Sequence, residues 1–327
     1  PLFPVQSRRR DAAAAAMSMA IVATAALLVD AGIGEPRRLH PLVGFGRWAR
    51  AVEGSMHADR RISGLLAWGL AVLPLVSVVA WAEHALQVRS PGWAMALSTL
   101  LLYLAVGHRS LWEHANPIAT ALASGDVTAA RAAVGQVVSR DTVGLDATQV
   151  AGAATESVLE NGCDAVFGAV FWFVLLGAPG AVLYRLANTL DAMWGYRTPR
   201  YTRFGWAAAR IDDAMNYVPA RLTAATYAIC GDARLAWRCW RAQGHRWKSP
   251  NAGPVMAAGA GAIGVRLGGP APYHGTWSDR PELGGGAAPD AASIEAALRL
   301  VRRGVLVWLL ALWIIATVLP LTVARHA

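Results

Sequence analysis

Three carboxylates are spaced at helical intervals in the middle of the chain: Glu156, Glu160 and Asp164. Residues four and eight positions apart lie on one face of an α-helix. Because three like charges on one face repel, we expect a cationic group to compensate them. Such carboxylates can hold a divalent ion beside phosphate groups, or accept a proton from a reacting amine. The competing interpretation is an ordinary solvated helix face.

A second acidic group stands on a later predicted helix. Asp212 and Asn216 are four residues apart, and Asp213 follows Asp212 directly. Arg210 and Arg221 flank the group, and guanidinium groups are well suited to neutralise phosphate oxygens. This segment therefore has the residue types for binding a phosphorylated substrate.

One more polar cluster lies between the two acidic groups. Asn161 belongs to the first acidic segment, and Asn188, Asp191 and Tyr196 form the next cluster, with Asn188 and Asp191 three residues apart. Each cluster adjoins an apolar run, and ionisable groups near a membrane are costly and therefore functional candidates. We predict that the clusters converge on one pocket that is open to water. In this arrangement the carboxylates on the same side are Glu160, Asp164, Asp191 and Asp212.

The segment Ser139, Arg140, Asp141, Thr142 places a hydroxyl, a guanidinium and a carboxylate side by side. This combination suits an anionic group such as a phosphate. The alternative is a turn with an internal Arg–Asp pair.

A proline-containing turn at residues 249–254 precedes an apolar helix. Backbone N–H groups at such a helix entry can bind phosphate, although Ser249 or Asn251 could equally be a plain N-cap. The glycines that follow, Gly259, Gly261 and Gly264, match G-x-G-x-x-G literally. No strand is predicted before them, so close helix packing by Gly264 and Gly268, with Ala260, is favoured over dinucleotide binding.

The segment that follows the first apolar run also carries candidate ligands. Asp30 and Glu35 could hold a metal ion, whereas Arg37, Arg38 and His40 could meet anions.

Composition indicates a membrane protein. Of 327 residues, 55% are hydrophobic and 16% are charged, against about 25% charged in soluble proteins. The net charge of +9 comes from scattered arginines, which disfavours nucleic acid as a partner and suits loops beside a membrane. Cys163, Cys230 and Cys239 form no C-x-x-C, so zinc and thiol chemistry are not indicated.

We predict an all-α, polytopic integral membrane protein with four or five transmembrane helices, together with amphipathic and soluble helices that form the active-site face. Residues 1–16 are interpreted as a disordered tail or a segment foreign to the native protein, and residues 17–327 as one membrane-embedded domain. Gly177 and Pro179 predict a break inside the fourth apolar segment. The candidate spans are Met17–Ile33, Ile62–Ala82, Trp93–Val106 (alone or joined to Arg109–Ala123), Val166–Leu186 and Val305–Val323, with Val218–Cys230 and Gly253–Leu267 marginal.

Between the spans we predict soluble-looking helices and one loop. A helix capped by Asp126 runs through Val138, a second covers Thr148–Asn161, and an amphipathic one covers Asp232–Gln243. The Gly/Pro-rich stretch Gly268–Asp290 is predicted to be a loop.

Specific motifs lie in the middle of the chain, and further ones lie near its N-terminus and late in the chain. They are NTLD-M-GY from Asn188, Tyr201, Phe204-Gly205, AAR-DD--N--PAR from Ala208, Asp30, Gly34, Pro36, His40-Pro41 and Ser249-Pro250-Asn251-Ala252-Gly253. With these motifs the chain resembles the CobD/CbiB family of adenosylcobinamide-phosphate synthases over roughly residues 20–320. The chain departs from the family pattern at Glu35, where the family has Asp.

The resemblance implies a reaction of cobalamin (vitamin B12) biosynthesis. An ATP- and Mg²⁺-dependent ligase would join adenosylcobyric acid, the corrinoid substrate, to (R)-1-aminopropan-2-yl phosphate or ethanolamine phosphate. The product would be adenosylcobinamide phosphate. The enzyme would be a multi-pass protein of the bacterial cytoplasmic membrane. Its partners would be the membrane lipids and other enzymes of the pathway.

Roles are assigned to residues on this basis. Catalysis is assigned to Glu156, Glu160, Asp164, Asp212 and Asp213, and metal binding to Asp30, Glu35, Glu160, Asp164 and Asp212. Substrate and phosphate binding is assigned to His40, Ser139, Arg140, Asp141, Thr142, Asn161, Asn188, Asp191, Tyr196, Arg210, Asn216, Arg221, Ser249 and Asn251. Two alternatives remain: another Mg²⁺-dependent membrane transferase of the prenyl or phosphatidyl type, and a non-catalytic transporter or sensor.

Overall fold

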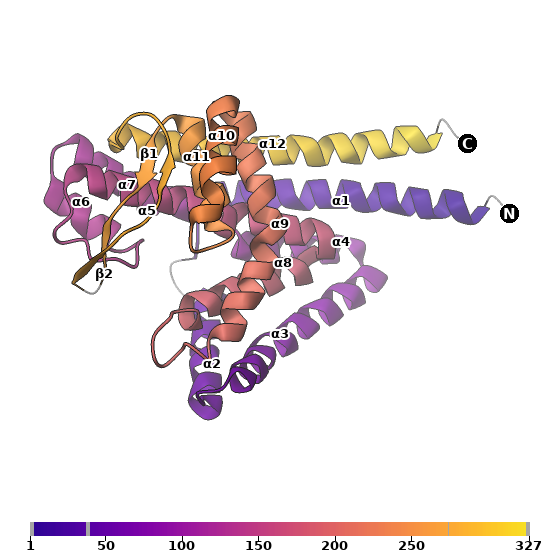
Figure 1. The fold of residues 1–327 in the computed structure, drawn as a ribbon. Helices are drawn as coiled ribbons and strands as arrows, with labels where there is room; N and C mark the ends of the chain where they lie inside the picture. Colours follow the sequence, from indigo (N-terminus) through magenta and orange to yellow (C-terminus); the bar gives the residue numbers. More distant parts are fainter. Residues whose placement is uncertain (1–2, 37–39, 274, 325–327) are drawn as a thin grey trace. The chain divides into compact units, whose positions relative to one another are not determined.

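The computed structural model describes residues 3–36, 40–273 and 275–324. The chain divides into two compact units (Figure 1). Unit 1 comprises residues 1–106, 169–210 and 305–327, and unit 2 comprises residues 107–168 and 211–304.

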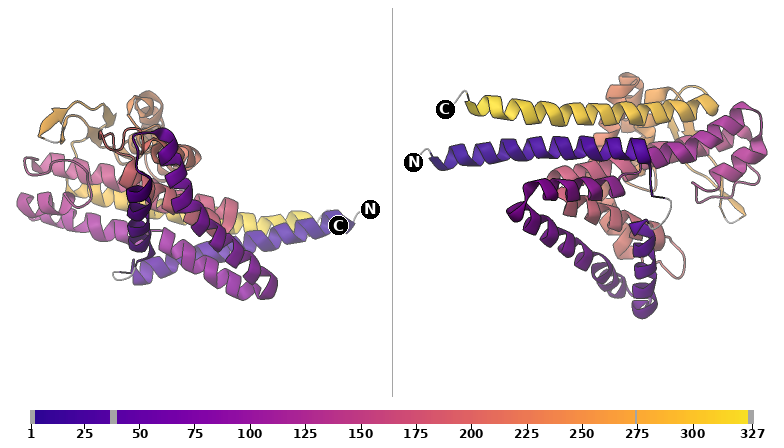
Figure 2. Two further views of the ribbon diagram at one scale, coloured as in Figure 1. Left: turned by 90° about the horizontal axis from the view of Figure 1, so that it is seen from below. Right: turned by 180° about the vertical axis from the view of Figure 1, so that it is seen from behind.

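Unit 1 is built from long apolar helices. It contains α1 (Phe3–Ile33), α2 (Pro41–Met56), α3 (Arg61–Arg89), α4 (Pro91–Ala105), nearly all of α8 (Gly168–Trp194) and the second part of α12 (Ala291–Ala324). That part of α12 runs beside α1 in every view (Figures 1 and 2). The Trp313 indole Nε1 donates a hydrogen bond of 3.0 Å to the Thr24 hydroxyl between the two helices. Helix α1 begins at Phe3, inside the segment that was predicted to be a tail.

Five helices of the described chain are long and apolar enough to cross a membrane, which confirms the predicted four or five spans. They cover Ala12–Ile33, Arg61–Arg89, Pro91–Ala123, Ala147–Trp194 and Ala291–Val318. The third is interrupted, because α4 ends at Ala105 and α5 (His108–Ala123) begins after Gly107.

Helix α8 breaks at Gly177, as predicted from Gly177 and Pro179. The backbone there adopts φ 67° and ψ −157°, a conformation that only glycine adopts readily. Glu83 of α3 lies at the break, where its Oε1 accepts from the Ala178 N–H at 3.4 Å and from the Ser98 hydroxyl at 2.6 Å. A carboxylate therefore faces the start of the second half-helix, where the helix dipole favours negative charge.

Unit 2 has a helical core around α11 (Ala252–Ile263), which is buried almost throughout. A Cβ on Gly259 would collide with Leu159 and Tyr227, and one on Gly261 would collide with the Ala236 backbone. Gly259 and Gly261 therefore serve close packing. Gly264, for which packing was predicted, instead ends α11 in the left-handed conformation (φ 68°) with open space around its Cβ position. Unit 2 also contains α5, α6 (Val127–Val134), α7 (Ala147–Gly162), the π-helix η1 (Cys163–Phe167), most of α9 (Trp206–Cys230), α10 (Ala233–Gln243) and the 3₁₀-helix η2 (Gly244–Arg246). Of these, α10, η2 and α7 contact α11.

The stretch predicted to be a loop contains four short strands, and in this respect the prediction was wrong. Strand β1 (Arg266–Gly268) pairs antiparallel with β4 (Glu282–Gly284), and β2 (Ala271–Tyr273) pairs antiparallel with β3 (Thr276–Ser278). Three-residue strands are too short to show alternating hydrophobicity, so their composition is typical of a loop. Helix α6 also ends at Val134, earlier than the expected Val138.

Candidate active site

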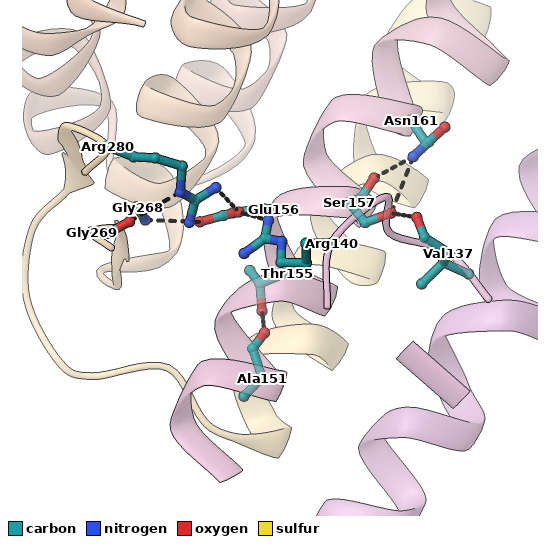
Figure 3. Close-up of polar contacts among 10 residues, drawn as sticks. All are labelled: Val137, Arg140, Ala151, Thr155, Glu156, Ser157, Asn161, Gly268, Gly269 and Arg280. Carbon is teal, nitrogen blue, oxygen red and sulfur yellow. Dashed lines mark hydrogen bonds and ion pairs between the residues drawn. The ribbon is translucent and has the colours of Figure 1, made fainter. Parts of the chain in front are cut away.

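The side chain of Glu156 is the centre of a buried polar cluster in unit 2 (Figure 3). Its helix, α7, starts with a capping box in which Asp146 and Gln149 satisfy each other's backbone N–H groups. The carboxylate is 4% exposed, and its Oε2 accepts from Arg140 and, at 2.9 Å, from Arg280 Nη1. Its Oε1 accepts from Arg280 Nη2 at 3.1 Å and from the Gly268 backbone N–H at 2.9 Å. The compensating cations expected for the acidic stripe are therefore present.

Arg280 is held from several directions and was not identified from the sequence. Its Nε donates to the Gly269 carbonyl at 3.0 Å, and its guanidinium lies 5.2 Å from the centre of the Trp247 ring. Burial alone would lower the pKa of Arg280, but the Glu156 carboxylate outweighs this effect and raises it. Arg280 lies in a Gly/Pro-rich segment with no helical spacing to relate it to Glu156, so no sequence signal pointed to the pair.

The segment that carries Arg140 is tied to the strand region. The Asp141 backbone N–H donates to the Pro272 carbonyl at 3.1 Å, and the Asp141 carboxylate accepts from the Gly275 N–H at 2.7 Å. Arg140 pairs with Glu156 and not with Asp141, which disfavours the internal Arg–Asp turn. Ser139 is exposed, and the Thr142 carbonyl accepts from Leu145 in a turn.

A cavity of about 200 Å³ opens beside this cluster. Its lining includes three arginines, two glutamates and the glycine-containing backbone from 268 to 271. The charged residues are Arg140, Arg266, Arg280, Glu156 and Glu282. We call it the arginine cavity. Cations and carboxylates around one small volume can hold a molecule that carries both a phosphate and an amine.

Glu160 and Asp212 form the second carboxylate group of unit 2. Glu160 lies one turn after Glu156 and within electrostatic reach of Arg140 and Asp212. Asp212 is buried, and the Asn216 amide donates to its Oδ2 at 3.1 Å. Within unit 2, Glu156, Arg140 and Asp212 thus all lie within electrostatic reach of Glu160.

The position of Asp164 corrects the predicted regular stripe. Helix α7 ends at Gly162, and Asp164 lies in the π-helix Cys163–Phe167. A π turn contains an extra residue, so the four-residue α spacing from Glu160 to Asp164 no longer applies. Asn161 donates back to the Ser157 carbonyl at 2.9 Å within its own helix.

Arg221, Asn251 and Asp213 meet at the entry to α11. Arg221 Nη1 donates to Asn251 Oδ1 at 2.7 Å, and the Asn251 amide donates to the Asp213 carbonyl at 2.8 Å. The cap of α11 comes from Ser249, whose hydroxyl accepts from the N–H groups of Asn251 and Ala252 at 3.3 and 3.1 Å. The helix entry is therefore capped by its own side chains, which agrees with the N-cap interpretation.

Metal binding stays a prediction. Among the described residues, no three His, Cys, Asp or Glu side chains gather to form a metal centre by themselves. Magnesium often uses only one or two carboxylates and completes its shell with water and substrate phosphates. Glu160 and Asp212 fit that smaller requirement. The three cysteines are free.

The remaining predicted site residues belong to unit 1, and their convergence with the unit 2 residues stays a prediction. They are Asp30, Glu35, His40, Asn188, Asp191, Tyr196 and Arg210. Asp30 is fully buried near the end of α1. Two hydrogen bonds fix the chain there: the Gly34 N–H donates to the Asp30 carbonyl at 2.8 Å, and the Tyr103 hydroxyl donates to the Gly34 carbonyl at 2.7 Å. Arg37 and Arg38 lie outside the described residues.

Some motif residues of unit 1 serve packing. Trp194 is buried edge-on against Phe204, with ring centres 5.1 Å apart, and a Cβ on Gly205 would collide with the Trp194 carbonyl. The Tyr201 hydroxyl donates to the buried carboxylate of Glu53 at 3.0 Å, and Arg200 donates to the same oxygen at 2.7 Å. Sequence reasoning missed Glu53, which stands alone on the amphipathic helix α2.

Known proteins are similar over most of this chain. The family model described as CobD/Cbib protein matches residues 23–301. The chain is 60% identical to a Cobalamin biosynthesis protein CobD of Stutzerimonas stutzeri, over 90% of this chain and 97% of that protein. A protein of the same name from Chromobacterium violaceum is 55% identical, over 89% of this chain and 95% of that protein. Another from Mycobacterium tuberculosis is 43% identical, over 84% of this chain and 88% of that protein. No solved structure matches significantly. The chain therefore belongs to the CobD/CbiB family of cobalamin biosynthesis proteins.

Proposed function

We propose that the protein is an adenosylcobinamide-phosphate synthase, which joins adenosylcobyric acid to an amino alcohol phosphate with ATP and Mg²⁺. Membership of the CobD/CbiB family supports cobalamin biosynthesis as the pathway. The observation that carries the proposed chemistry is the arginine cavity with its buried Glu156 anchor. We further propose that the multi-pass protein resides in the bacterial cytoplasmic membrane, where it is accessible to the other enzymes of the pathway.

The size of the arginine cavity favours the smallest substrate. At about 200 Å³ it falls below the roughly 300–1,000 Å³ of pockets that bury drug-sized ligands. A nucleotide or a corrinoid is too large for it, whereas an amino alcohol phosphate is small. Arg140, Arg266 and Arg280 would hold the phosphate, and Glu282 would face the ammonium group.

Glu156 is best suited to a positioning role. Both of its oxygens already accept hydrogen bonds from two guanidinium groups and one backbone N–H. A carboxylate occupied in this way is a poor metal ligand or base. It fixes the two guanidinium groups in place, so that they lose little freedom when a phosphate binds.

The reaction needs an activated acid, because a carboxylate does not react with an amine unaided. The γ-phosphoryl group of ATP is transferred to a carboxylate oxygen of adenosylcobyric acid, which gives an acyl phosphate and ADP. The amine nitrogen then attacks the acyl carbon, the bond between that carbon and the phosphate oxygen breaks, and inorganic phosphate leaves. The proton lost from nitrogen passes to a protein carboxylate.

Glu160 and Asp212 are the residues we assign to the nucleotide. As a carboxylate pair with Arg140 in reach, they could hold Mg²⁺ together with the ATP phosphates. The ion, when bound, neutralises phosphate charge and orients the γ-phosphoryl group.

The substrate assignment is tested by replacing Arg266, which lines the arginine cavity and is exposed. Arg266→Met should raise KM for the amino alcohol phosphate by about tenfold, through loss of a charge-assisted hydrogen bond, and leave KM for ATP unchanged. Arg299→Met is the matched control, because Arg299 is exposed and pairs with Glu295 outside the cavity. A rise in KM for ATP alone would assign the cavity to the nucleotide instead.

An isotope experiment tests the acyl phosphate. Adenosylcobyric acid labelled with ¹⁸O in the reacting carboxylate should deliver one labelled oxygen to inorganic phosphate. Label that appears only in water or AMP would contradict the proposed activation.

A further inference from the structure

Unit 1 contains a second cavity, of about 380 Å³, that the proposed reaction does not use. Helices α2, α3, α4 and α8 contribute to its lining, through residues such as Leu42, Trp48, Leu75, Leu104 and Leu186. The lining is apolar except for one charged residue, Arg185. We call it the Arg185 cavity.

The guanidinium of Arg185 lacks an acceptor at its Nε. This nitrogen is buried, and no described residue accepts a hydrogen bond from it. Arg185 stands in the second half of α8, inside a helix that is long and apolar enough to span a membrane. A cation in such a segment is costly unless a polar or anionic partner satisfies it.

His40 presents a second donor of the same kind. It is the N-cap of α2, and its Nδ1 accepts from the Leu42 backbone N–H at 3.2 Å. Burial lowers the pKa of His40, the nearby charge of Glu35 opposes this, and the charge of Arg185 lowers it further. Because Nδ1 accepts the hydrogen bond from Leu42, the ring carries its proton on Nε2, which is buried and has no acceptor among the described residues.

The two donors lie in one neighbourhood beside the cavity. Arg185 is close enough to influence the charge of His40, and Pro41 and Leu42, which directly follow His40, line the cavity. Glu35 is also nearby, yet it leaves both buried nitrogens without an acceptor. The start of α2 adds the positive end of a helix dipole. An anionic oxygen at this point would accept hydrogen bonds from Arg185 Nε and His40 Nε2 and would also be stabilised by the dipole of α2.

The apolar walls indicate what else the ligand carries. A free phosphate would leave them empty, whereas an acyl chain would fill them. Helices α3 and α8 are candidate membrane spans, and α2 exposes Val43 and Trp48, as a helix at the membrane surface does. The combination is that of a phospholipid, with its phosphate at the surface and a chain between helices.

We propose that the Arg185 cavity binds one anionic phospholipid, with the phosphate held by Arg185 and His40 and an acyl chain lying along Leu75, Leu104 and Leu186. This is independent of the proposed ligase activity.

Native mass spectrometry of the full-length, detergent-solubilised protein tests the site. After delipidation, phosphatidylglycerol is added back, and phosphatidylcholine and sn-glycerol 3-phosphate serve as comparisons. We expect one tightly bound phosphatidylglycerol per chain, weaker binding of phosphatidylcholine, and no competition by sn-glycerol 3-phosphate at equal concentration. Competition by sn-glycerol 3-phosphate would overturn the proposal and identify a site for small phosphates.

Variants assign the binding to the cavity. Arg185→Met should weaken phosphatidylglycerol binding about tenfold or more, and Arg185→Lys should retain most of it. Arg47→Met is the matched control, because Arg47 is an exposed cation on helix α2 and does not line the cavity. Equal loss in both Met variants, or no loss in Arg185→Met when its thermal unfolding matches the wild type, would overturn the proposal.

Discussion

The buried cluster around Glu156 predicts a strong energetic coupling between Glu156 and Arg280. The Glu156 and Arg280 side chains are 4% and 9% exposed and share two hydrogen bonds of 2.9 and 3.1 Å. Breaking a buried pair by removing one partner costs about 3–5 kcal/mol, because the other charge stays buried without compensation. Arg140 still compensates Glu156 when Arg280 is lost, so we expect about 3 kcal/mol for Arg280→Met, at the low end of that range.

The double variant should cost less than the sum of its parts. Glu156→Gln leaves Arg280 and Arg140 facing a neutral acceptor, and removing Arg280 as well relieves part of that penalty. We expect a coupling free energy of about 2 kcal/mol between the two substitutions. The measurement is the free energy of unfolding in detergent for the wild type, Glu156→Gln, Arg280→Met and the double variant.

An exposed ion pair of the same unit provides the control. Arg299 and Glu295 are four residues apart on α12, 3.1 Å apart and about half exposed. Solvent screens such a pair, so the same cycle with Arg299→Met and Glu295→Gln should give no more than about 0.5 kcal/mol. A coupling at Glu156–Arg280 that is no larger than this would refute the interpretation of the cluster as a buried anchor.

Three further predictions concern single positions. Glu160→Gln and Asp212→Asn should each lower kcat by about a hundredfold or more with the fold intact, because each removes a charge at the proposed nucleotide site; steady-state turnover near the wild-type value in either variant would remove that residue from the site. Gly177→Ala should destabilise the protein by about 1–3 kcal/mol in thermal unfolding, because its φ of 67° is strained for any other residue and the new Cβ would lie 3.2 Å from the Glu83 carboxylate; an unchanged midpoint would contradict the break in α8. Asp126→Ala should cost about 1 kcal/mol, since its carboxylate caps the Ala129 N–H at 2.9 Å; equal stability of both proteins in the same assay would show that the cap is unimportant.

Regular periodicity made the helices predictable from sequence. Long apolar runs give spans, and Asp126 and Asp232 mark helix starts by their type and position. The break at Gly177 was also predictable, because a glycine and a proline close together inside an apolar run both weaken a regular helix.

The site was only partly predictable, because its partners are far apart in sequence. Glu156 and Glu160 were recognisable by their spacing on one helix. Arg280 reaches Glu156 across 124 residues from a segment without periodicity, and no local rule encodes that contact. The π-helix that contains Asp164 has no sequence signature in CDAVF. Glu53 could be recognised only from its hydrogen bonds with Arg200 and Tyr201, which are far away in sequence.

Mass spectrometry of the reaction product tests the central claim most directly. Purified protein would be incubated with adenosylcobyric acid, ATP, Mg²⁺ and either (R)-1-aminopropan-2-yl phosphate or ethanolamine phosphate. The proposal predicts a new corrinoid whose mass equals the sum of the acid and the amine minus one water, together with one ADP per amide formed. Unchanged adenosylcobyric acid with both amines, in protein that is folded and binds ATP, would contradict it.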